Sequence, residues 1–157
     1  MKEIERKFLV DVNKLLLTTN KVVEENQIEQ GYLCKDDGKT VRIRIQDQTG
    51  FLTIKGKLEN ISRNEFEFKI PIEDAKELLK MCDKTIVKKR ITIKYDKKYW
   101  FIDVFDNENR GLVIAEIELK KEKEKVSLPK WLLKEVSNDS KYYNCNLISN
   151  PFNTWTA

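Results

Sequence analysis

The feature of this sequence with the clearest chemical meaning is a series of like-charged residues spaced two apart. Each pair carries a single sign, and the pairs are Glu3 and Glu5, Arg42 and Arg44, Glu65 and Glu67, Lys88 and Arg90, and Glu116 and Glu118. Side chains at i and i+2 of a β-strand share one face, where neighbouring like charges repel each other. The pattern therefore favours strands whose charged face binds something of opposite sign.

Two kinds of ligand fit such rows of charge. Arg and Lys bind phosphate oxygens, and carboxylates bind divalent cations. The sequence contains no His, so a metal site must use oxygen ligands, which favours Mg²⁺, Mn²⁺ or Ca²⁺. Mechanisms that need a His base or a His–Cys pair are excluded for the same reason. A metal ion bridging carboxylates and phosphates would join the acidic and basic rows, and a short phosphate chain would fit along the basic one.

Alternation of apolar and charged residues predicts the strands that position these rows. In the first strand, Glu3, Glu5 and Lys7 share one face and oppose an apolar face. The predicted strands cover residues 3–10, 28–34, 41–46, 51–57, 63–70, 86–95, 99–105 and 112–119. Helical periodicity predicts helices over residues 12–18 and 71–82. Two further helices are expected in the tail, over 128–137 with Pro129 near its start, and over 139–148 with Asp139 as its N-cap.

Short strands separated by turns, such as Asp37-Gly38, favour an antiparallel meander that closes into a barrel. The expected fold is one α+β domain over residues 1–157, an eight-stranded antiparallel closed β-barrel with a charged interior and helices packed outside. The alternative is an ordinary sheet whose charged face meets water. The sign-matched pairs, the helices available to cover an apolar exterior, and the separate acidic and basic blocks favour the charged interior. Burying so many ions in a dry interior would be costly, so the interior is expected to be a wet tunnel.

Composition limits the expected partners and location. The chain has 157 residues, of which 30 are basic and 26 acidic, and its net charge of +4 argues against nucleic acid as the main partner. Cys34, Cys82 and Cys145 match neither a disulfide framework nor a zinc spacing, and free thiols suit a reducing cytosol. No apolar run is long enough to span a bilayer. We expect a cytoplasmic protein without membrane or nucleic-acid partners, and a homodimer remains open.

The charged motifs together resemble the CYTH domain family, also called triphosphate tunnel metalloenzymes. "EIERK" resembles the ExExK motif that opens these domains, and "VRIR", "TIKG", "NEFEF", "KKR", "WFIDVF" and "AEIEL" follow in order, before the tail "WLLKEVSND" and "YYN". ExExK alone is a weak signal because alternating charge is common, whereas the ordered series spans nearly the whole chain. The resemblance implies an eight-stranded antiparallel tunnel that hydrolyses or rearranges triphosphates with divalent metal ions.

The resemblance also implies roles for individual residues. The metal, one or two ions of Mg²⁺ or Mn²⁺, would bind Glu3, Glu5, Glu116 and Glu118. The triphosphate would bind Lys7, Arg42, Arg44, Lys55, Lys88 and Arg90. The residues expected to be catalytic are Glu3, Glu5, Lys7 and Glu118. Two roles stay open for three further carboxylates, either a second metal or the orientation of basic side chains, and these are Glu65, Glu67 and Asp103.

Several other residues are expected to lie outside this machinery. Three basic residues lie on the strand faces expected to line the tunnel but near strand ends, so we predict that they are at the surface, namely Arg63, Lys57 and Lys69. Lys89 should point outward. Gln30 and Tyr32 could face the tunnel without an assigned role. Trp100 and Trp131 are expected to pack in the apolar core.

The expected reaction is hydrolysis of inorganic triphosphate, also called tripolyphosphate, to pyrophosphate and phosphate. The same family includes thiamine triphosphatases and class IV adenylate cyclases, so thiamine or nucleoside triphosphates are alternative substrates. The cyclase pattern carries extra residues before ExExK, including a His-Phe pair, and this chain has no His. An alternative of another class is a module that binds polyphosphate or a nucleotide without turnover.

Overall fold

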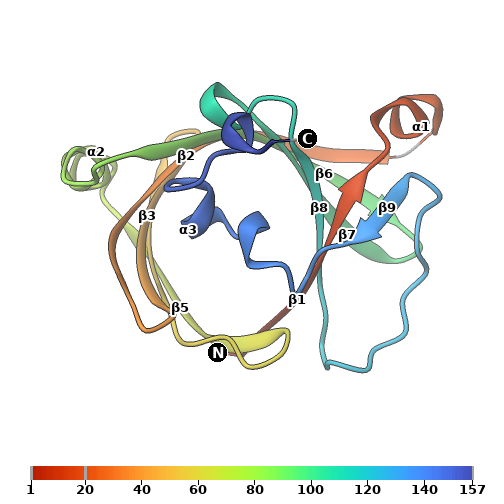
Figure 1. Cartoon of the computed structure of the whole chain (residues 1–157), viewed down its shortest axis with the longest axis horizontal. Coiled ribbons are helices and arrows are strands. Elements are labelled where there is room, and N and C mark those ends of the chain that lie inside the picture. Colours follow the sequence, from red (N-terminus) through yellow and green to blue (C-terminus); the bar gives the residue numbers. More distant parts are fainter. Residues whose placement is uncertain (1, 20, 157) are drawn as a thin grey trace.

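The computed structural model describes residues 2–19 and 21–156, in which eight antiparallel strands close into a barrel and a ninth strand lies outside it (Figure 1). The barrel strands are β1 (Lys2–Val10), β2 (Lys21–Asp36), β3 (Lys39–Gln46), β4 (Thr49–Lys55), β5 (Ser62–Ile70), β6 (Thr85–Tyr95), β7 (Lys98–Phe105) and β8 (Val113–Glu118). The outer strand is β9 (Leu132–Glu135). The predicted closed barrel is therefore confirmed, with one strand more than expected.

Two meanders build the barrel wall. Strands β2 to β5 follow one another as hairpins, β6 to β8 form the second meander, and β2 pairs with β6 to join them. Strand β1 closes the ring, because it pairs with β8 at Glu5↔Glu118 and with β5 at Glu3↔Arg63. The predicted Asp37-Gly38 turn joins β2 to β3, with φ of +42° and +75° in the left-handed region that such tight hairpin turns require.

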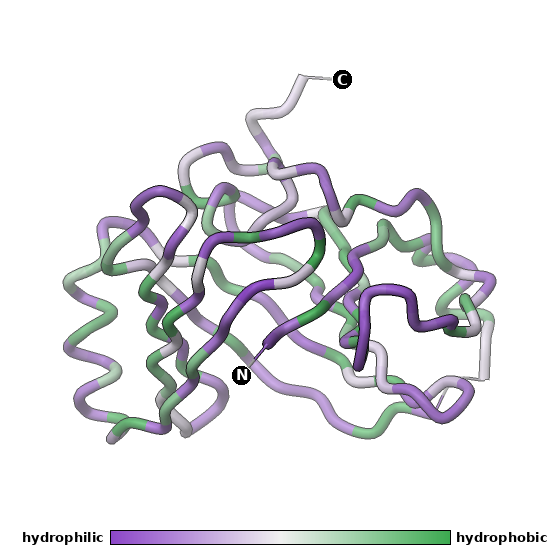
Figure 2. The backbone as a smooth tube through the Cα atoms, turned by 90° about the horizontal axis from the view of Figure 1, so that it is seen from below, coloured by the Kyte–Doolittle hydropathy of each residue, from purple (hydrophilic) through white to green (hydrophobic). Residues whose placement is uncertain are grey.

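The apolar faces of the strands point out of the barrel, as the parity of the sequence predicts. Figure 2 shows hydrophilic and hydrophobic residues alternating along the strands. Helix α2 (Ile72–Lys80) covers Ile43 on the outer face of β3, and its Ala75 lies so close to Gly50 that a Cβ there would be only 2.7 Å away. Trp100 and Trp131 are fully buried and meet edge to face at 5.8 Å, which confirms their packing role.

The remaining helices are short. Helix α1 (Val12–Leu17) begins where the Asp11 side chain accepts a hydrogen bond from the Lys14 backbone amide. The other short elements lie near the C-terminal end of the chain or pack with it. They are helix α3 (Asn144–Leu147) and the 3₁₀ turns η1 (Asn107–Asn109), η2 (Ser140–Tyr142) and η3 (Phe152–Thr154). The longest helix in the described part of the chain, α2, has nine residues, and no helix there could cross a bilayer.

The structure corrects three expectations about secondary structure. The predicted helix over 128–137 is wrong, because residues Leu132–Glu135 form β9 along the edge of β1 that β5 leaves open. The predicted helix over 139–148 is split into η2 and α3, although Asp139 does cap η2 with its side chain. Strand β2 is longer than predicted, since residues 21–27 also pair with β6.

Candidate active site

A cavity of about 260 Å³ occupies the barrel interior. Every predicted site residue except Asp103 lines it, namely Glu3, Glu5, Lys7, Arg42, Arg44, Lys55, Glu65, Glu67, Lys88, Arg90, Glu116 and Glu118. The charged faces therefore point inward, and the alternative of an ordinary solvent-facing sheet is wrong. Much of the charge inside the barrel is held in direct ion pairs.

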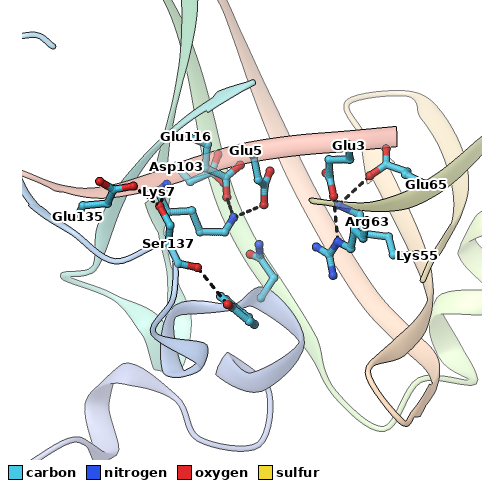
Figure 3. A network of polar contacts seen from close by, with 12 residues as sticks. Glu3, Glu5, Lys7, Lys55, Arg63, Glu65, Asp103, Glu116, Glu135 and Ser137 are labelled. Carbon is cyan, nitrogen blue, oxygen red and sulfur yellow. Dashed lines mark hydrogen bonds and ion pairs between the residues drawn. The ribbon is translucent and has the colours of Figure 1, made fainter. Parts of the chain in front are cut away.

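One side of the interior holds a closely paired network of five residues, Lys7, Lys88, Arg90, Asp103 and Glu116, called here the paired network. The Asp103 carboxylate is fully buried and accepts hydrogen bonds from Arg90 Nε at 2.7 Å, Arg90 Nη2 at 2.8 Å and Lys88 Nζ at 2.6 Å. Glu116 accepts from Arg90 Nη2 at 2.8 Å and from Lys7 Nζ. Each carboxylate thus contacts two cations, which fixes the positions of the basic side chains. Figure 3 shows Lys7 reaching Glu116 of this network and Glu5 beside it.

The paired network changes the acidity of its own members. Burial opposes ionisation, but Arg90 and Lys88 hold the pKa of Asp103 below its ordinary value. Burial also opposes ionisation of Glu116, whose pKa Lys7 and Arg90 hold well below the ordinary value. Burial and repulsion by Arg90 lower the pKa of Lys88 to about 8, although Asp103 and Glu116 oppose this shift. Both carboxylates are therefore ionised at neutral pH, and Lys88 is the member of the paired network whose ammonium pKa is lowered.

Two arginines on the opposite side have too few partners. Arg44 Nη2 lies 3.1 Å from Glu67 Oε1, and Arg42 Nη2 lies 3.4 Å from Oε2 of the same carboxylate, so two cations share one anion. The Nε atoms of Arg42 and Arg44 are buried and have no hydrogen-bond partner among the residues that the structure describes. Burial and repulsion by Arg42 lower the pKa of Arg44 to about 10. A buried, under-neutralised pair of guanidinium groups is suited to an anion with several oxygen atoms, such as phosphate.

Around Glu118, by contrast, negative charge is in excess. Within residues 2–19 and 21–156, the Glu118 side chain has no hydrogen bond or ion pair. Burial and the nearby charges of Glu5, Glu3 and Glu65 raise the pKa of Glu118. Since Glu118 lies opposite Glu5 in the β1–β8 register, several carboxylates gather there with too little positive charge.

These carboxylates fit a hard cation by ligand type and by strand position. In the described part of the chain, no three Asp, Glu or Cys side chains already form a group that could hold a metal ion. Instead, Glu3 accepts from Lys55 Nζ at 2.6 Å and from Arg63 Nε at 2.9 Å, while Glu5 Oε1 lies 2.7 Å from Lys7 Nζ. The oxygen-only donor set and the excess negative charge at Glu118 are what Mg²⁺ or Mn²⁺ requires.

The structure corrects the prediction for Arg63. This residue was expected at the surface, but it lines the cavity and contacts Glu3, because the β1–β5 pairing places Arg63 directly opposite Glu3. The predictions for Lys57 and Lys69 are confirmed, since both are exposed. Lys89 is half-buried and forms an ion pair with the exposed Glu25, outside the cavity lining.

Some cavity residues were not predicted from the sequence. The segment from Ser137 to Cys145 lies across one opening of the barrel (Figure 1), and four of its residues line the cavity, namely Ser137, Tyr143, Asn144 and Cys145. Ser137 Oγ accepts a hydrogen bond from the Lys7 backbone amide at 2.9 Å, and Asn144 Oδ1 accepts from Lys88 Nζ at 3.2 Å. These residues carry no alternating charge that could have revealed them.

The alternation of side-chain faces along a strand could have predicted two further residues of the cavity lining. Asn26 and Thr92 also line the cavity, and each shares a strand face with a residue that was predicted or considered there. Gln30 and Tyr32, considered without a role, do face the cavity, and burial raises the pKa of Tyr32 to about 12.

Comparison with known proteins gives consistent results. The CYTH domain model matches residues 1–146 of the chain. A curated protein of Acetivibrio thermocellus named inorganic triphosphatase is 40% identical over 153 residues, which cover 96% of each chain. The crystal structure of the inorganic triphosphatase NE1496 superposes with a TM-score of 0.67 and 27% identity, covering 93% of each chain.

A more distant structure shares the fold. The structure of "putative adenylyl cyclase HpAC1 from Hippeastrum", whose description gives it a dominant triphosphatase activity, superposes with a TM-score of 0.59 and 12% identity, covering 76% of this chain and 80% of its own. The tunnel of alternating charge, the ordered motifs and the match over most of the sequence lead to one assignment. The chain belongs to the CYTH domain family.

Proposed function

We propose that this protein is a metal-dependent triphosphatase that hydrolyses inorganic triphosphate to pyrophosphate and phosphate. The observation that carries the proposal is that the buried Nε groups of Arg42 and Arg44 face the same cavity as Glu118, and that among the described residues neither these groups nor the Glu118 carboxylate has a partner. One place lacks negative charge and the other lacks positive charge. A phosphate chain with a divalent cation supplies both.

The basic residues of the cavity would bind the phosphate groups. Arg42 and Arg44 offer free donors, whereas Lys7, Lys88 and Arg90 are held in position by carboxylates and Lys55 by Glu3 and Glu65. Positioning and charge stabilisation are the main requirements of phosphoryl transfer. The reaction therefore needs neither a His base nor a Ser or Cys nucleophile, which is compatible with a sequence that contains no His.

The metal ion, Mg²⁺ or Mn²⁺, would be held by Glu3, Glu5 and Glu118, with Glu116 beside them. When bound, it would offset charge on the phosphate oxygens and could activate the attacking water. Glu3 and Glu5 would exchange their present contacts with Lys55, Arg63 and Lys7 for the ion, and those cations would then be available to the phosphates.

The contacts of the three remaining carboxylates favour an orienting role over a second metal. Both oxygens of Asp103 are engaged by Arg90 and Lys88, and Glu67 accepts from both arginines. Glu65 forms an ion pair with Lys55 at 2.8 Å. We propose that Asp103, Glu67 and Glu65 hold the basic side chains in place for the triphosphate.

In the reaction, a water oxygen bonds to a terminal phosphorus atom while the bridging P–O bond to that phosphorus breaks. Pyrophosphate leaves and orthophosphate forms. Among the candidate substrates we propose inorganic triphosphate, because the relative from Acetivibrio thermocellus is named for that activity and aligns over nearly the whole chain.

A phosphate-release assay tests the proposal. The purified chain is incubated with Mg²⁺ and, in parallel, with tripolyphosphate, ATP or thiamine triphosphate. We expect the fastest release from tripolyphosphate, and loss of release in EDTA and in Glu5→Gln. Formation of cyclic AMP from ATP would favour the cyclase alternative. Tight binding of tripolyphosphate without release would favour the non-catalytic module and contradict the proposal.

A further inference from the structure

Thr53 lies between two charged residues of the cavity, on the inner face of β4. In the sheet register it is directly opposite Arg42 on β3 and directly opposite Glu67 on β5. Its side chain is fully buried, with 0% exposure, and it is not among the residues that line the cavity. Directly opposite side chains on neighbouring strands are close enough to interact. The longer Arg42 and Glu67 side chains therefore both reach the short Thr53 side chain.

The Thr53 hydroxyl group connects the cation to the anion. Its Oγ1 accepts a hydrogen bond from Arg42 Nη2 at 3.2 Å and donates one to Glu67 Oε2 at 2.9 Å. A guanidinium group has only donors, so the hydroxyl oxygen must be the acceptor toward Arg42, which leaves the single hydroxyl proton for Glu67. Thr is branched at Cβ, and its limited side-chain rotation keeps the hydroxyl group in this position.

The ion pair between Arg42 and Glu67 is incomplete. Arg42 Nη2 lies closer to the neutral Thr53 hydroxyl group, at 3.2 Å, than to Glu67 Oε2, at 3.4 Å. A fully formed pair of Arg with a carboxylate uses two parallel hydrogen bonds of about 2.7–2.9 Å. Arg90 and Asp103 form such a pair in the same barrel, with Nε and Nη2 at 2.7 and 2.8 Å from the two carboxylate oxygens. Arg42 therefore keeps charge and donors that Arg90 uses for its carboxylate.

We propose that Thr53 is a positioning residue for triphosphate binding. Its hydroxyl group holds Glu67 Oε2 and keeps this carboxylate from closing into a fully formed pair with Arg42. Arg42 then retains donors for the phosphate oxygens. Because Thr53 is buried outside the cavity lining, it acts through its two neighbours and not on the substrate. The inference rests on the proposed function, since the triphosphate is the anion that Arg42 would bind.

The first test separates KM from kcat. Thr53→Val keeps the shape of the side chain and removes the hydroxyl group, so Glu67 is free to pair fully with Arg42. We expect KM for tripolyphosphate with Mg²⁺ to rise about tenfold and kcat to change by less than about threefold, because the loss affects substrate binding. Thr53→Ser, which restores the hydroxyl group, should have a KM near that of the wild type. The same rise in KM for Thr53→Ser and Thr53→Val would contradict the inference.

Two controls show whether the effect belongs to this hydroxyl group. Thr49→Val makes the same replacement at a half-buried residue of β4 whose side chain has no hydrogen bond among the described residues, and its KM should equal that of the wild type. Circular dichroism establishes that each variant is folded. If Thr53→Val does not fold, Thr53→Ala provides the same test, because it also lacks the hydroxyl group.

The second test is a double-mutant cycle with Glu67→Gln. This variant has no carboxylate to close on Arg42, so adding Thr53→Val to it should change KM by less than about threefold. A packing defect caused by the Val side chain would instead raise KM equally with and without Glu67→Gln. The same fold increase in both backgrounds would therefore overturn the inference.

The third test does not depend on turnover. Isothermal titration calorimetry in EDTA measures the Kd for tripolyphosphate, which Thr53→Val should raise about tenfold in the wild-type background and much less in the Glu67→Gln background. A wild type that binds tripolyphosphate but releases no phosphate would contradict the proposed function and leave this prediction in force. An unchanged Kd in Thr53→Val, or no binding of tripolyphosphate by the wild type with or without Mg²⁺, would overturn the inference.

Discussion

The two sides of the tunnel use similar charged side chains for different purposes. In the paired network, each of Asp103 and Glu116 contacts two cations, and every member has a close partner of opposite sign. Across the cavity, Arg42 and Arg44 share Glu67 and keep unsatisfied Nε groups. Beside the paired network, on β8 two residues after Glu116, Glu118 has no partner in the described part of the chain. The difference teaches that burial and charge alone do not identify a ligand site. The sites to examine are those where charge is left uncompensated.

The largest expected effect comes from breaking the paired network at its centre. Asp103→Asn removes the fully buried anion that holds Arg90 and Lys88, and removing one partner of a buried ion pair costs about 3–5 kcal/mol. For a chain of this size we expect the melting temperature to fall by roughly 6–20 °C in a thermal unfolding scan. Glu67→Gln is the control, because its carboxylate is 30% exposed and should cost much less. Equal losses for both variants would contradict the comparison.

The second prediction concerns the under-neutralised arginines. Arg44→Met should lower kcat/KM for tripolyphosphate by about 10²-fold or more, the size of effect found when one donor to a charged transition state is removed. Stability should change little, because burial and Arg42 already disfavour the Arg44 charge, as the lowered pKa of Arg44 indicates. Steady-state kinetics and a thermal scan of the same samples give both values.

The matched control for Arg44→Met is Lys89→Met, also on a strand but facing outward beside Glu25. Its kcat/KM should equal that of the wild type. An Arg44→Met variant that loses stability and keeps its activity would reverse the roles assigned to the two sides of the tunnel.

The third prediction follows from the low pKa values of Asp103 and Glu116. A carboxyl group whose pKa is lowered by folding contributes stability above its ordinary pKa, and that contribution is lost as the pH falls toward the folded value. The ordinary values are 3.8 and 4.5, so stability should decline progressively below about pH 4.5. Urea unfolding from neutral pH down to about pH 3 measures this decline, which should be shallower in Asp103→Asn. A wild-type profile that is flat in this range would show that the network adds no net stability.

The smallest effect is expected at Glu118. In EDTA, Glu118→Gln should raise the melting temperature slightly, because the repulsion that raises the pKa of Glu118 is removed. On addition of Mg²⁺ or Mn²⁺, the wild type should become more stable and the variant should gain less. A thermal scan with and without the metal tests both statements, and Glu122→Gln, in the loop after β8, provides a control. Equal gains for Glu118→Gln and the wild type would contradict a role for Glu118 in metal binding.

Much of this fold and site could be predicted from the sequence because strand parity is local. Glu3, Arg44 and Glu116 each alternate with apolar neighbours, so their common inward orientation follows once the barrel closes. Arg63 was misplaced because its environment depends on the β1–β5 seam, which joins strands about 60 residues apart. The β9 segment was misread as a helix for a similar reason, since only the free edge of β1 makes a strand there favourable.

The sequence by itself determined the strand faces, the signs of the two walls and, through its ordered motifs, the family. The tertiary structure decided which of the charges are neutralised, because ion pairing depends on distances between strands that the order of residues does not specify. It also brought the segment from Ser137 to Cys145 over one opening of the barrel. Local alternation fixes where a side chain points, whereas the fold fixes what it meets there.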